Sequence, residues 1–263
     1  MVANLFKPDE LHVLVEDYRL SLERSPDHSL SVHAIDLMEP SFLLDYLNEV
    51  STLLNASTRV VAASLFSKRY SYLMIASSLY AMTMFDKAFD YSIENCYIDY
   101  SKDEQLWLPN LRLAHWDISQ PVDGKREEWR DQVIRHIFAE NIAVVWRSMS
   151  KTAPISKSVL WENTSIYVYW LYEKRMSEGA TAEQKMRIED DFRYLLKAAP
   201  AHLFGETLNP LAKFDQPKML TAKSDEPIRI RKTCCLYYQT CVEEDYCSTC
   251  PKLKQEAVSI ISS

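Results

Sequence analysis

The chain has 263 residues, a formal net charge of −7 and an ordinary content of apolar residues. This length is enough for one main domain with a small appendage. The negative charge argues against a general nucleic-acid-binding protein, because neutralising phosphates requires a surplus of Lys and Arg.

The scarcity of glycine excludes proteins that bind nucleotides through glycine-rich loops. The three glycines, Gly124, Gly179 and Gly205, lie far apart in the sequence. Glycine-rich phosphate loops of the dinucleotide-binding or P-loop kind are therefore absent. If the chain is a redox enzyme, we expect its electrons to arrive from another protein.

The N-terminal residues predict a cytoplasmic protein. They contain no basic stretch followed by an apolar run, so no export signal is predicted. In the cytoplasm thiols stay reduced. The longest uncharged run, Tyr70 to Phe85, is slightly short for a membrane span and contains several Ser and Thr residues. We therefore predict a buried core helix there and no membrane span.

The first third of the chain predicts helices. Pro8 and the apolar spacing after it indicate an amphipathic helix ending near Arg24, and a short alternating piece occupies residues 28–38. Pro40 begins a second helix. The apolar segment from Ser57 to about Lys87 predicts one buried helix, or two in succession with a break near residues 67–69.

In the middle of the chain the spacing of apolar residues changes from helical to alternating, and it then becomes helical again. Alternation between Phe89 and Trp116 predicts two or three antiparallel strands. Helical faces follow at about residues 126–149 and at about 156–174. Thr181 and Gln184 form a capping box for a helix through Leu196.

The C-terminal part predicts an irregular connection and a separate module. Residues 206–227 are polar and contain three prolines, and Ile228–Arg231 alternates like a strand that would deliver Cys234. We expect an α+β fold, predominantly helical, with a small antiparallel sheet. Residues 1–223 would form the helical-rich domain, and residues 224–263 would form the cysteine module.

Four cysteines provide the strongest chemical signal: Cys234, Cys235, Cys247 and Cys250. Cys247 and Cys250 form a C-x-x-C chelate suited to zinc or an iron–sulfur cluster. The side chains of the adjacent Cys234 and Cys235 can converge on one metal only if the backbone is locally distorted. A two-iron cluster, which spreads its thiolates over two metals, tolerates adjacent ligands better than a zinc ion does. Structural zinc with four cysteine ligands remains the alternative, and disulfides are less favoured in the cytoplasm.

These residues also resemble a known family. Arg231-Lys-Thr-Cys-Cys-Leu-Tyr-Tyr and Cys247-Ser-Thr-Cys-Pro resemble the C-terminal signature of the FhuF-like ferric-siderophore reductases. The resemblance implies a [2Fe–2S] cluster held by the four cysteines named above. Eleven residues separate Cys235 from Cys247, one more than in the family pattern, and they include Cys241. Residues 64–70 and 158–163 resemble other family segments, with Glu162 in place of a glycine.

Candidate substrate-binding residues are less sharply defined. None of the six histidines shows metal-binding spacing. Most aromatic residues at helical spacing should fill the core, and mixed charge is ordinary on a solvated surface. The candidates for binding a large organic chelate are Lys68, Arg69, His115, Trp116, Trp161, Asn163, Arg229 and Arg231.

The resemblance implies an oxidoreductase acting on metal ions. A ferric siderophore would be its substrate, and one electron would convert tightly held Fe(III) to weakly held Fe(II). A ferredoxin or flavodoxin system would supply the electron. The competing hypothesis is a non-enzymatic binding or interaction protein with structural zinc.

Overall fold

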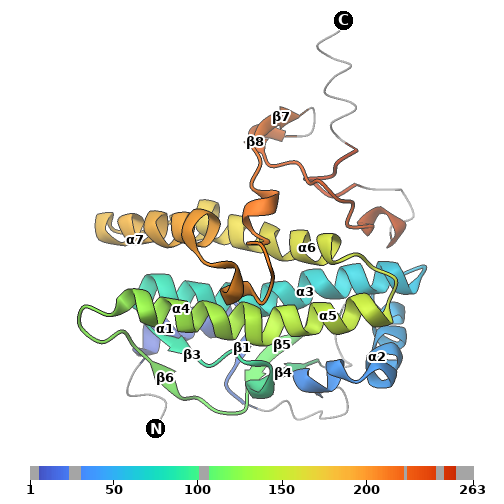
Figure 1. The fold of residues 1–263 in the computed structure, drawn as a ribbon, viewed down its shortest axis with the longest axis horizontal. Coiled ribbons are helices and arrows are strands. Elements are labelled where there is room, and N and C mark those ends of the chain that lie inside the picture. The colour runs from blue at the N-terminus through green and yellow to red at the C-terminus, as the bar shows by residue number, and fades with distance from the viewer. Residues whose placement is uncertain (1–5, 24–30, 101–106, 222–223, 241–245, 253–263) are drawn as a thin grey trace, which may run out of the picture.

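The computed structural model describes residues 6–23, 31–100, 107–221, 224–240 and 246–252. Long helices form the body of the molecule, with most strands on one side and the C-terminal cysteine segment on the other (Figure 1). The α-helices are α1 (Pro8–Glu16), α2 (Pro40–Leu53), α3 (Arg59–Tyr80), α4 (Arg126–Ile137), α5 (Ala143–Thr152), α6 (Lys157–Trp170) and α7 (Ala182–Arg193).

Single wider π-helical turns extend or join several of these helices. They cover Ala81–Phe85, Phe138–Ile142, Leu171–Arg175 and Tyr194–Ala198. The predicted helices at about 126–149, 156–174 and 181–196 are thereby confirmed, each with a π turn within it or at its end. Short 3-10 turns occupy Ala34–Met38, Ile93–Asn95, Ala201–Phe204, Ala212–Phe214 and Tyr237–Thr240.

The strands are short. They are β1 (Leu20–Ser21), β2 (Val32–His33), β3 (Ala88–Phe89), β4 (Cys96–Asp99), β5 (Asn110–Leu113), β6 (Ile118–Ser119), β7 (Met219–Thr221) and β8 (Ser224–Ile228). Four of them form a sheet in the order β1-β5-β4-β2, in which only β1 and β5 are parallel. Two further antiparallel pairs are β3 with β6 and β7 with β8. The predicted α+β class is confirmed.

Helix α3 forms the centre of the molecule. Thr58 caps its first turn by accepting a hydrogen bond from the amide of Val61. Small residues such as Ala63, Ser64 and Ser67 are fully buried and let α6 approach closely. The predicted break near residues 67–69 is wrong. Lys68 and Arg69 lie on the partly exposed face of α3, so they interrupt the apolar run without interrupting the helix.

Two predictions near the ends of the chain are also wrong in position. Helix α1 ends at Glu16, not near Arg24, because Leu20–Ser21 leaves the helix to pair with β5. The predicted strand at Ile228–Arg231 lies earlier, since β8 already ends at Ile228. The expected domain boundary falls between the paired strands β7 and β8, and the division into two domains stays a prediction.

Among the described residues, no helix is both long and apolar enough to cross a membrane. The predicted core helix at residues 70–85 is confirmed, as its residues are mostly buried. One large apolar core occupies the helical body. Ile230 and Cys250 form a second, small cluster within the cysteine segment.

Candidate metal centre

The cysteine segment, residues 229–240 and 246–252, folds its four predicted ligands into two turns. The sulfur atoms of Cys235 and Cys247 lie 3.5 Å apart, although they come from different turns. Cys235 and Cys250 are buried, whereas Cys234 and Cys247 are half-buried. None of the described cysteines is in a disulfide. Cys241 lies outside the described residues.

The backbone of both turns is bent toward the sulfurs. Leu236, directly after the adjacent pair, has a positive φ of 61° and its amide donates to Cys234 Sγ at 3.4 Å. A leucine with positive φ is unfavourable and must be held by its surroundings. The Cys250 amide closes the second turn on the Cys247 carbonyl at 2.9 Å. The distortion predicted for adjacent cysteines is thus found at the following residue.

Buried side chains of the helical body hold the first turn. Ser64 Oγ on α3 donates to the Cys235 carbonyl at 2.8 Å. Asn163 on α6 donates to the Ser64 carbonyl at 3.0 Å and accepts from Arg231 Nη2 at 2.6 Å. The Arg231 amide in turn donates to the Thr249 carbonyl at 2.9 Å, which joins the two cysteine turns. The cysteine segment is therefore tied to both α3 and α6.

Glu162, which occupies the glycine position of the family-like segment, caps the chain just before Cys234. Its carboxylate accepts from the Lys232 amide at 2.6 Å and from the Thr233 amide at 2.7 Å. It also accepts from the Thr233 hydroxyl, and it lies 3.8 Å from Arg231 Nε. The side chains of Glu162 and Arg231 are both almost fully buried, so each charge is stabilised by the other.

The electrostatics of the sulfur pair favour thiolate at Cys235. Its pKa is lowered to about 5, because its sulfur shares a hydrogen bond with that of Cys247 and because Lys68 and Arg231 are near, against the opposing effect of burial. The same hydrogen bond raises the pKa of Cys247. Positive groups around a pair of thiols are suited to holding anionic sulfur ligands.

The donor set fits a [2Fe–2S] cluster. Each iron of such a cluster takes two cysteine thiolates. Two thiolates at about 2.3 Å from one tetrahedral metal are about 3.8 Å apart, near the observed 3.5 Å separation of Cys235 and Cys247. A pair of thiolates at this separation can bind one metal atom of such a cluster.

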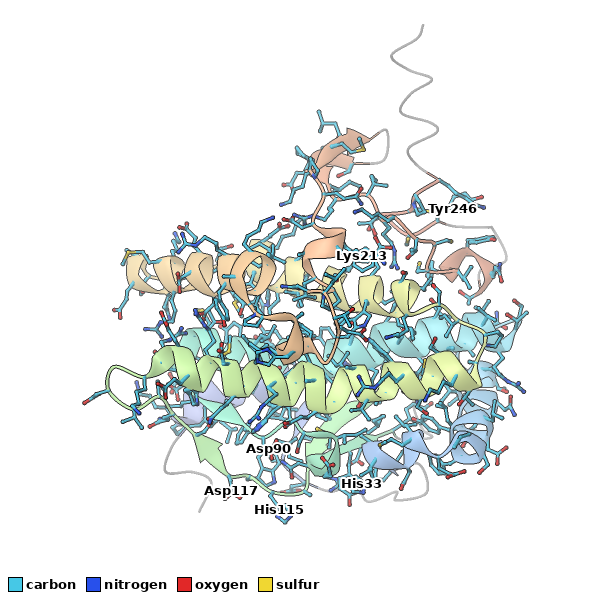
Figure 2. The ribbon with its side chains drawn as sticks, viewed as in Figure 1. His33, Asp90, His115, Asp117, Lys213 and Tyr246 are labelled. Carbon is cyan, nitrogen blue, oxygen red and sulfur yellow. The ribbon has the colours of Figure 1, made fainter. Side chains whose placement is uncertain are left out.

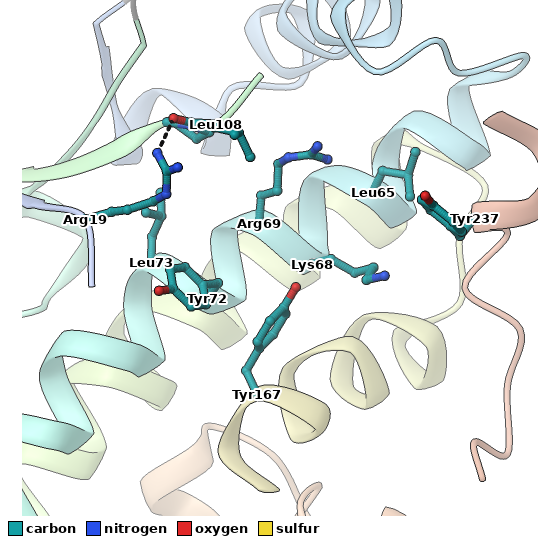
Figure 3. Close-up of a pocket in the computed structure, with 10 residues that line it drawn as sticks. Arg19, Leu65, Lys68, Arg69, Tyr72, Leu73, Leu108, Tyr167 and Tyr237 are labelled. Carbon is teal, nitrogen blue, oxygen red and sulfur yellow. Dashed lines mark hydrogen bonds between the residues drawn. The ribbon is translucent and has the colours of Figure 1, made fainter. Parts of the chain in front are cut away.

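The eight candidate substrate-binding residues do not share one pocket: Lys68 and Arg69 line one cavity, and Arg229 and Arg231 line another. Lys68 and Arg69 project from α3 into a cavity of about 350 Å³ that also contacts Tyr237 of the cysteine segment (Figure 3). Asn163 and Arg231 are buried and hydrogen-bonded to each other, and Arg231 Nη1 has no hydrogen-bond partner among the described residues.

The remaining four candidates lie elsewhere. Arg229 is paired with Glu173 at 2.8 Å. The Trp161 indole donates to Glu206 at 3.2 Å. His115 is exposed and lies at the opposite end of the view from Tyr246 of the cysteine segment (Figure 2). Its neighbour Trp116 packs edge-on against Phe89. A substrate role for these residues stays a prediction.

Sequence reasoning missed several residues around the centre. Arg19, Tyr72 and Tyr167 line the same cavity as Lys68 and come from three different elements. No short-range pattern connects them. Tyr237 follows Cys235 by only two residues, and this spacing could have marked it as a neighbour of both the cysteines and a ligand.

Comparison with known proteins agrees with this geometry. The family described as "Ferric iron reductase FhuF-like transporter" matches residues 64–218, more than half of the chain. The family described as "FhuF 2Fe-2S C-terminal domain" matches residues 231–252, which contain all four predicted ligands. No curated protein gives a significant match. The chain therefore belongs to the FhuF-like ferric iron reductase family and has its C-terminal [2Fe–2S] domain.

Proposed function

We propose that this protein is a cytoplasmic ferric-siderophore reductase, with Cys234, Cys235, Cys247 and Cys250 as the ligands of its cluster. The observation that carries the proposal is the contact between Cys235 Sγ and Cys247 Sγ, 3.5 Å apart, in a segment fastened to the helical body. Sulfurs from two turns meet beside a cavity large enough for part of an organic chelate.

A bound cluster supplies a single electron, which the ferric ion gains without transfer of any atom. Hard oxygen ligands hold Fe(II) far more weakly than Fe(III), so the ion is then free to leave. The chain's own residues bring the chelate close to the cysteines and keep the ligand turns rigid through Glu162, Asn163 and Arg231. Rigid ligand turns reduce the reorganisation that accompanies electron transfer.

The electron donor is another protein, such as a ferredoxin or flavodoxin. No glycine-rich nucleotide loop occurs in the sequence. Purified protein should therefore not oxidise NADH or NADPH unaided.

Anaerobic isolation followed by single-turnover reduction tests the proposal. The protein should be reddish-brown and contain two irons and two acid-labile sulfides per chain. After reduction by dithionite and removal of excess reductant, one equivalent of a ferric siderophore should reoxidise the protein and yield Fe(II) to a coloured ferrous chelator. A colourless protein with one zinc per chain would establish the structural-zinc alternative instead.

A further inference from the structure

Arg231 is hydrogen-bonded to both cysteine turns and to the helical body. Its backbone amide donates to the Thr249 carbonyl, in the second turn, at 2.9 Å. Its Nε atom donates to the Thr233 carbonyl, directly before the first turn, at 3.0 Å. Its Nη2 atom donates to Asn163 Oδ1 on α6 at 2.6 Å. The guanidinium therefore has a fixed position close to the predicted ligands.

The remaining nitrogen of this side chain, Nη1, is buried and makes no hydrogen bond to any described residue. The Arg231 side chain is only 1% exposed, so bulk water does not reach the atom. A buried N–H group of a charged side chain is unfavourable unless an acceptor binds to it. The position of Arg231 in the cysteine segment indicates where such an acceptor would lie.

Arg229, two residues earlier, provides a contrast within the same segment. Its Nε atom donates to the Gln216 carbonyl at 3.0 Å. Both of its terminal nitrogens donate to Glu173, at 3.0 and 2.8 Å. All three nitrogens of Arg229 are thus used within the protein. A nitrogen without a partner is particular to Arg231 and is not a general feature of the arginines in this segment.

The charge of Arg231 acts on the proposed ligands. The hydrogen bond between the sulfurs of Cys235 and Cys247, and then burial, have the largest effects on the pKa of each thiol. The charges of Lys68 and Arg231 follow, and both favour the thiolate at either cysteine. Arg231 is therefore close enough to the sulfurs to influence an anion bound by them.

A [2Fe–2S] cluster is such an anion. With four thiolate ligands it carries two negative charges when both irons are ferric, and reduction adds a third. Hydrogen bonds to its sulfurs help to set its reduction potential. The Leu236 amide, which donates to Cys234 Sγ at 3.4 Å, provides one bond of this kind. Arg231 Nη1 could provide another, and a charged donor forms a stronger bond than an amide does.

We propose that Arg231 donates a hydrogen bond from Nη1 to a sulfur of the bound cluster and that this bond raises the cluster's reduction potential. This inference rests on the ligand assignment proposed above. Reduction adds one electron to the cluster and moves no atom or proton, so a charged donor stabilises the reduced cluster more than the oxidised one. Glu162, whose carboxylate lies 3.8 Å from Arg231 Nε, has the opposite effect on the potential.

The alternative acceptor is a carboxylate of the chain itself. Glu243, Glu244 and Asp245 lie between the two turns in the sequence and outside the described residues. Arg231 already faces the buried carboxylate of Glu162, so a second carboxylate would leave this group with an excess of negative charge. A bond to a carboxylate would also form without a cluster, whereas a bond to the cluster should strengthen on reduction.

Redox titration of the cluster-loaded protein tests the proposal. Arg231→Lys keeps a positive charge beside Glu162 but lacks the second terminal nitrogen. It should lower the equilibrium constant for reduction by a fixed mediator about tenfold, which corresponds to about 59 mV for a one-electron couple. Arg229→Lys, in which a guanidinium bonded within the protein is replaced, is the matched control and should keep the parent's potential.

A second variant covers the case in which Arg231→Lys does not fold. Glu162→Gln combined with Arg231→Gln removes both buried charges together, so neither is left unpaired. Its potential should be lower than that of Glu162→Gln alone. A potential equal to the parent's in Arg231→Lys would show that charge alone acts and would overturn the hydrogen bond. Equal potentials in Glu162→Gln and the double variant would exclude any effect of Arg231.

Pulsed EPR of the reduced cluster detects the hydrogen bond directly. When the arginine nitrogens are isotope-labelled, the parent and Arg229→Lys should both show hyperfine coupling between the cluster and a labelled nitrogen, and Arg231→Lys should show none. Absence of the coupling in the parent, or its persistence in Arg231→Lys, would overturn the proposal. Iron and acid-labile sulfide are measured on the same samples. A parent without a cluster defeats the proposed function, whereas a loaded parent without the coupling defeats only this inference.

Discussion

Arg231 and Asn163 connect the cysteine segment to the core of the helical body through a hydrogen bond of 2.6 Å from Nη2 to Oδ1. Both residues are buried. The Asn163 amide nitrogen also donates to the Ser67 hydroxyl at 2.7 Å and to the Ser64 carbonyl at 3.0 Å. One side chain thus links α6, α3 and the segment that contains the cysteines.

Asn163→Leu should destabilise the protein by about 2–4 kcal/mol, because it leaves Arg231 and the two serines buried without this partner. Urea unfolding of the cluster-free protein measures the change. Asn48→Leu, on the exposed face of α2, should stay within about 0.5 kcal/mol of the parent. A loss of similar size in both variants would contradict the linking role of Asn163.

Glu162→Gln should raise the midpoint potential of the cluster. The carboxylate lies directly against the residues that precede Cys234, and removing its negative charge favours the more negative, reduced cluster. We expect a shift on the order of 40 mV, equivalent to about 1 kcal/mol for a one-electron couple. Redox titration gives the value, with exposed Glu178→Gln as the control. An unchanged or lower potential would show that Glu162 acts only on the backbone.

The ligand assignment predicts a sharp division among the cysteines. Serine at position 234, 235, 247 or 250 should abolish or greatly weaken cluster binding, since each residue provides one thiolate. Cys241→Ser should keep the cluster. Cys96→Ala should also keep it, because Cys96 is buried in the main core. Loss in Cys241→Ser together with retention in Cys247→Ser would show that the extra residue shifts the ligand set.

The sequence predicted the helices and the cysteine turns better than their mutual arrangement. Thr181 and Gln184 form the expected capping box, since such signals lie within one turn of the chain. Lys68 and Arg69 suggested a break because a linear reading cannot tell the exposed face of a buried helix from its end. The cavity could not be foreseen, because Arg19, which has a φ of 58°, lies immediately before β1, and β1 pairs with the distant strand β5.

Acid should weaken the ion pairs of Glu173 with Arg229 and Lys218. Burial raises the pKa of Glu173, but hydrogen bonds from Arg229 and Lys218 outweigh it and place the pKa below the ordinary 4.5. A lowered carboxyl pKa stabilises the fold above the unfolded value and loses that contribution as the pH falls through the folded value. The difference in unfolding free energy between the parent and Glu173→Gln should therefore be constant above about pH 5 and shrink below 4.5.

Exposed Glu178→Gln supplies the control for this titration. Its difference from the parent should be small and should vary less with pH, since a solvated ion pair contributes little. A difference for Glu173→Gln that grew toward low pH would mean that the carboxyl is protonated in the folded protein and that the ion pairs with Arg229 and Lys218 do not stabilise it.

Release of gallium tests whether reduction, and nothing else, opens the chelate. Gallium(III) resembles Fe(III) in charge and size but has no accessible divalent state, so it should bind and yet stay in the chelate. With a strong competing chelator present, the pre-reduced protein should release iron quickly and gallium no faster than the oxidised protein does. His115→Ala should leave single-turnover electron transfer unchanged, because His115 lies far from the cysteine segment (Figure 2). Gallium release at the rate of iron release would mean that the protein distorts or cleaves the chelate, and the electron-transfer mechanism would have to be abandoned.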